Sequence, residues 1–63
     1  MKLSENMPST TKGLINDALA FAKYPNDSEA MEYLNEVLIE LSFVMNLGNF
    51  QVFKGRINTM LNA

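Results

Sequence analysis

The 63-residue chain contains no cysteine and no histidine, and these absences exclude several stabilising and catalytic devices. Without cysteine no disulfide can cross-link the fold, and the lack of both residue types removes the usual zinc ligands. A chain of this length forms one domain, which buries only about 60% of its unfolded surface. Side-chain packing, with any self-association, must therefore supply the stability.

Positive charge is also scarce. Five Lys and Arg residues stand against seven Asp and Glu residues, which gives a net charge of −2. Nonspecific DNA binding needs several cations that neutralise phosphates, and the five here are scattered. Nucleic acid is therefore an unfavourable partner, and a basic protein surface is electrostatically easier to bind.

No long hydrophobic run is present. The longest apolar stretch, residues 37–47, is interrupted by Glu40, Ser42 and Asn46, whereas a membrane span needs about 20 apolar residues. The first residues also lack the apolar core of a signal peptide. We therefore expect a soluble protein without a membrane partner, and the absence of cysteine also suits the cytoplasm.

Catalytic patterns are missing as well. The Ser and Thr hydroxyls have no histidine to act as a base, and the three glycines are too isolated to form a phosphate-binding loop. No acidic run matches a calcium loop. We expect no enzymatic activity, no catalytic residue, no cofactor and no metal.

The apolar spacing predicts helices after a flexible N-terminal arm, residues 1–8, which ends at Pro8. Residues 9–63 then form a single helical domain, whose first helix follows the candidate caps Ser9, Thr10 and Thr11. Gly13 weakens its first turn, and Tyr24-Pro25 ends it. Its apolar stripe is Leu14, Ile15, Ala18, Leu19 and Ala22.

A longer second helix is predicted from about Asp27 to Leu47. Asn26 with Glu29 resembles a capping box, and Gly48 suits the left-handed position after a helix. The short connection makes the first two helices antiparallel neighbours. The expected buried arc of the second helix is Ala30, Met31, Leu34, Val37, Leu38, Leu41, Val44 and Met45.

The opposite side of this helix is acidic at first and apolar later. Its acidic row is Glu29, Glu32, Glu36 and Glu40. This row either solubilises the helix or attracts a basic partner. Ile39, Phe43 and Leu47 follow on the same side at spacings of four. They either pack under Phe50 and Phe53 or form an interface with another protein or a second copy of the chain.

Residues 49–62 are predicted as a third, shorter helix capped by Asn49. Its apolar face is Phe50, Phe53, Ile57, Met60 and Leu61. A hairpin turning at Lys54-Gly55 is the alternative, because Phe and Val favour strands. The expected fold is therefore all-α, a helical hairpin with a short third helix, with pairing of two copies through the second helix as a further expectation.

The second and third helices also allow a DNA-binding alternative, a helix-turn-helix. The side chains available to contact DNA bases would be Gln51, Lys54, Arg56, Asn58 and Asn62. The preceding helix is acidic and long for that motif. The favoured function is a non-enzymatic regulatory protein–protein interaction module with Ile39, Phe43, Leu47, Phe50 and Phe53 as its interface.

The whole chain resembles small early-region accessory proteins of lambdoid bacteriophages, encoded between the exonuclease and excisionase genes. The resemblance rests on the N-terminal segment Met1-Lys2-Leu3-Ser4-Glu5-Asn6-Met7-Pro8, on Tyr24-Pro25-Asn26-Asp27 and on Arg56-Ile57-Asn58. It implies a protein of the bacterial cytoplasm that modulates phage development or host physiology through contacts with host or phage proteins. No individual functional residue follows from it.

Overall fold

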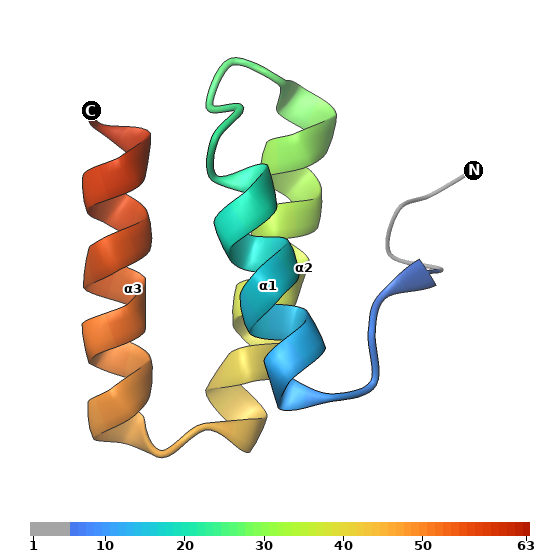
Figure 1. Cartoon of the computed structure of the whole chain (residues 1–63), viewed down its shortest axis with the longest axis vertical. Coiled ribbons are helices and arrows are strands. Elements are labelled where there is room, and N and C mark those ends of the chain that lie inside the picture. The colour runs from blue at the N-terminus through green and yellow to red at the C-terminus, as the bar shows by residue number, and fades with distance from the viewer. Residues whose placement is uncertain (1–5) are drawn as a thin grey trace.

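Three helices form the computed structural model, which describes residues 6–63, and no strand occurs in that range. Helix α1 spans Thr11–Phe21, α2 spans Ser28–Val44 and α3 spans Leu47–Leu61. The all-α prediction is confirmed, and the hairpin alternative for the last segment is wrong. Helices α1 and α2 form an antiparallel pair, and α3 returns alongside in the same direction as α1 (Figure 1).

Helix α1 begins where the sequence offers its hydroxyl caps. The Thr10 side chain accepts a hydrogen bond from the Gly13 backbone N–H at 3.0 Å, which satisfies one of the free donors of the first turn. Gly13 has a steric role too, because a Cβ there would lie 2.7 Å from the Pro8 Cβ. The glycine therefore lets the preceding segment pack closely against the first turn.

The start of α2 differs from the predicted capping box. Asp27, rather than Asn26, caps the helix, and its carboxylate accepts from the N–H groups of Glu29 and Ala30 at 3.0 and 3.1 Å. A carboxylate also interacts favourably with the positive end of the helix dipole, an advantage that the neutral Asn26 side chain lacks. The predicted Asn26 cap is therefore wrong.

The end of α2 also differs from the prediction. The helix stops at Val44, Met45 is extended, and Asn46 caps α3 by accepting from the Asn49 N–H at 3.0 Å. Gly48 lies inside α3 with a negative φ, so it does not terminate a helix, and Asn49 is not a cap. The Asn46 side chain can satisfy the new helix start directly, which explains why the chain turns earlier than the glycine suggests.

The core lies mainly between α1 and α2. Ala18 and Ala22 belong to the buried cluster there, and their small side chains allow the two helices to approach closely; Ala30 is buried outside this cluster. Helix α3 adds Phe53 and Ile57 to the same cluster. The remaining buried members are Leu14, Tyr33, Leu34, Val37 and Leu41. Leu19, Met31 and Leu38 are half-buried at the edge of the core, where the sequence predicts buried faces.

The predicted arm, residues 1–8, is described only in part, because residues 1–5 lie outside the described range. Met7 and Pro8 are half-buried, and Met7 packs against the core cluster. This short segment therefore adds apolar cover to the helical pair.

Candidate functional site

Apolar side chains lie exposed where α2 ends and α3 begins. Phe43 is 78% exposed and Leu47 72%, with Val44 at 55% and Ile39 at 48%. We call these four residues the corner surface. They occur within nine consecutive positions, at the end of the molecule opposite the α1–α2 loop (Figure 1).

The local structure explains this exposure. Ile39 and Phe43 are one helical turn apart, on the side of α2 that faces away from the buried Val37 and Leu41. Helix α3 directs Phe53 into the cluster that contains Val37 and Leu41, so it does not cover the opposite side. Packing of Ile39 and Phe43 under α3, one of the two alternatives left by the sequence, does not occur.

The predicted interface residues thus separate into two groups. Ile39, Phe43 and Leu47 are exposed, whereas Phe50 is half-buried and Phe53, at 9% exposure, belongs to the core. Phe53 therefore supports the fold from within. Val44 differs from the prediction in the opposite direction, because the sequence places it in the buried arc and the structure leaves it exposed. It is exposed because the helix ends there and the chain turns away at Met45.

An acidic row borders the corner surface. Glu29, Glu32, Glu36 and Glu40 are all exposed, and the last three form no ion pair within residues 6–63. Glu32 and Glu36 continue the stripe of Ile39 and Phe43 toward the start of α2, at spacings of four, three and four residues. The outer side of α2 is thus acidic in its first half and apolar in its second.

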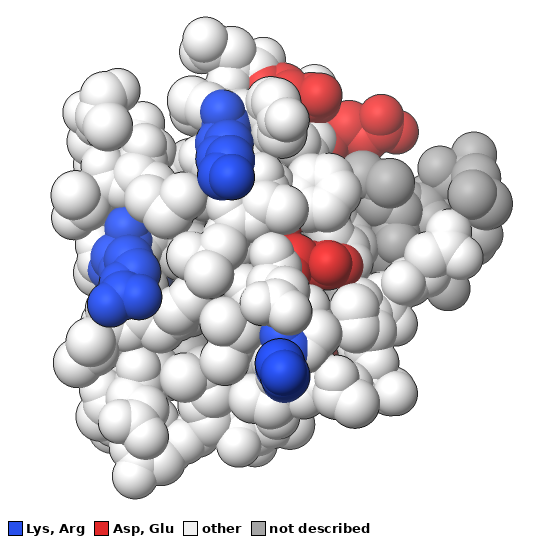
Figure 2. Space-filling model, viewed as in Figure 1, with Lys and Arg blue, Asp and Glu red and all other residues white. Residues whose placement is uncertain are grey.

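The cations of residues 6–63 lie elsewhere. Lys12 is in α1 and Lys23 just after it, while Lys54 and Arg56 are in α3. On the face drawn in Figure 2, the Lys and Arg side chains occupy separate places and form no continuous patch. This distribution lacks the clustered positive charge typical of a DNA-binding surface.

One buried side chain has an altered acidity. Burial, followed by a hydrogen bond to Asp17, raises the pKa of Tyr33 from 10.0 to about 12. Tyr33 lies in α2 and also contacts the Phe21 ring edge-to-face, with centroids 4.7 Å apart. Its hydroxyl joins α2 to α1, so the structure assigns it a packing role that the sequence analysis missed. The signal was present, since Tyr33 stands three residues after Ala30 and four before Val37.

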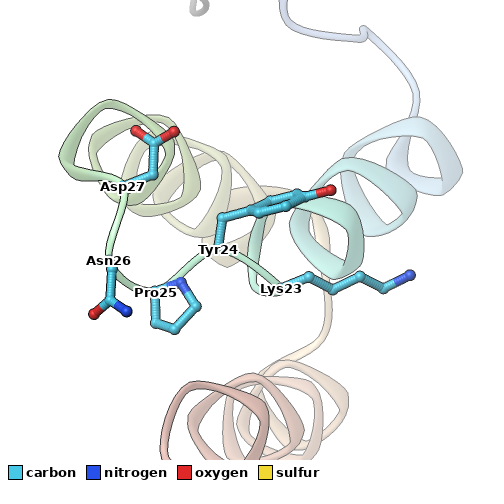
Figure 3. A pocket seen from close by; sticks show the side chains of 5 residues that line it. All are labelled: Lys23, Tyr24, Pro25, Asn26 and Asp27. Carbon is cyan, nitrogen blue, oxygen red and sulfur yellow. The ribbon is translucent and has the colours of Figure 1, made fainter.

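A shallow hollow lies at the other end of the molecule, in the α1–α2 loop. It is lined by Lys23, Tyr24, Pro25, Asn26 and Asp27. The charged ends of Lys23 and Asp27 point in different directions (Figure 3), and the Asp27 carboxylate is already engaged in capping α2. All five residues are exposed, so the hollow contains no buried polar group that would orient a ligand.

Other kinds of site can be checked within residues 6–63. No three acidic, histidine or cysteine side chains in that range are grouped so that they could hold a metal ion. No helix in the same range combines the length and the hydropathy needed to cross a membrane. Of the large apolar side chains that residues 6–63 leave exposed, four belong to the corner surface, whereas Tyr24 lies in the α1–α2 loop and Val52 in α3.

Comparison with protein families, curated proteins and solved structures finds no match to this chain. The functional inference therefore depends on the chemistry of the corner surface and its acidic border.

Proposed function

We propose that this chain is a non-enzymatic, regulatory protein-binding module, and that the corner surface is where the partner binds. The observation that carries the proposal is the exposure of Phe43 and Leu47. These two large apolar side chains lie in the last turn of α2 and at the start of α3. Single exposed apolar residues are ordinary, whereas four of them within nine positions, as in residues 39–47, favour a contact site. The neighbouring glutamates favour a partner whose rim is basic.

The biological setting is part of the proposal. The resemblance to lambdoid early-region proteins supports a role in the bacterial cytoplasm, in which contacts with host or phage proteins modulate phage development or host physiology. A protein partner fits the charge distribution better than DNA, because the outer side of α2 is acidic and the four cations of residues 6–63 are dispersed.

The test is affinity capture from infected and uninfected bacterial cells, with mass-spectrometric identification of what binds. The full chain is compared with Phe43→Ser and with Tyr24→Ser, a matched control at another exposed aromatic residue, which lies in the α1–α2 loop. We expect specific partners to be lost with Phe43→Ser and kept with Tyr24→Ser. Equal loss with both variants, or no specific partner for the wild type, would contradict a binding role for the corner surface.

A further inference from the structure

We draw no further inference here: the strongest candidate, the exposed apolar corner surface where α2 ends and α3 begins, belongs to the site already described, and nothing in the structure shows what covers it.

Discussion

The Tyr33 hydroxyl of α2 donates a hydrogen bond to the Asp17 carboxylate of α1, and this contact links the two helices that form most of the core. Tyr33 is 5% exposed, whereas Asp17 is half-buried. The carboxylate thus accepts a hydrogen bond from the hydroxyl of an otherwise apolar, buried ring, and no buried polar side-chain atom in the described residues is left without a partner.

This contact predicts a loss of stability at high pH. The pKa of Tyr33 is raised from 10.0 to about 12 in the folded chain, so the unfolded chain releases the phenol proton first as pH increases. The stabilisation is complete below pH 10 and is lost as pH rises toward 12, by an amount on the order of 2 kcal/mol. Urea unfolding at a series of pH values measures it. Tyr33→Phe is the control, since lysines also titrate in this range; an equal decline in that variant would refute the assignment.

Truncation of the core should be severe. Leu41 is fully buried in α2, and Leu41→Ala should lower the free energy of unfolding by about 2–5 kcal/mol. For a domain this small such a loss is a large part of the total stability. Val52→Ala, at an exposed position, should change it little. Thermal or denaturant unfolding of both variants provides the comparison, and similar melting of Leu41→Ala and wild type would contradict the described core.

Two helical glycines should respond to alanine in opposite ways. A Cβ at Gly55 would meet nothing within 4 Å, so Gly55→Ala should stabilise the protein by up to about 1 kcal/mol through helix propensity. At Gly13 the added Cβ would lie 2.7 Å from Pro8, so Gly13→Ala should be destabilising. Unfolding midpoints measured under identical conditions decide this. A larger gain at Gly13 than at Gly55 would show that Pro8 does not pack there.

Specific DNA binding should be absent at nanomolar concentrations and physiological salt. Lys54 and Arg56 are the cations of α3, and α3 returns beside α2 instead of projecting across it (Figure 1). Fluorescence titration with random and phage-derived duplexes measures binding at about 150 mM salt. Nanomolar affinity that is lost in the Lys54→Ala, Arg56→Ala double variant would instead support the helix-turn-helix alternative.

The sequence predicts the three helices well because their apolar residues recur at helical spacing. It predicts the helix ends less well, because several neighbouring residues compete for each cap. Asn26 and Asp27 are both good caps, and only the folded geometry selects Asp27. Similarly, Gly48 suits a helix end, but Asn46 begins α3 two residues earlier.

The candidate surface could be predicted only in part. The spacing of Ile39 and Phe43 places them opposite the core, and the structure leaves both exposed. The fate of Phe53 depends on how α3 lies against α2, a tertiary relationship that helical periodicity does not contain. The burial of Val44 depends on where α2 stops, which the spacing of apolar residues does not specify either.

Helix α3 contributes Phe53 and Ile57 to the buried core of residues 6–63, while α1, the adjoining Ala22 and α2 supply the other members. The amide hydrogens of α3 should therefore exchange with solvent through a partial opening that leaves the α1–α2 pair intact. Exchange in α2 should require unfolding of the whole domain. The α1–α2 pair would then stay folded while α3 opens and closes. The exchange rates of the amide hydrogens near Leu47 would change when a partner binds beside them.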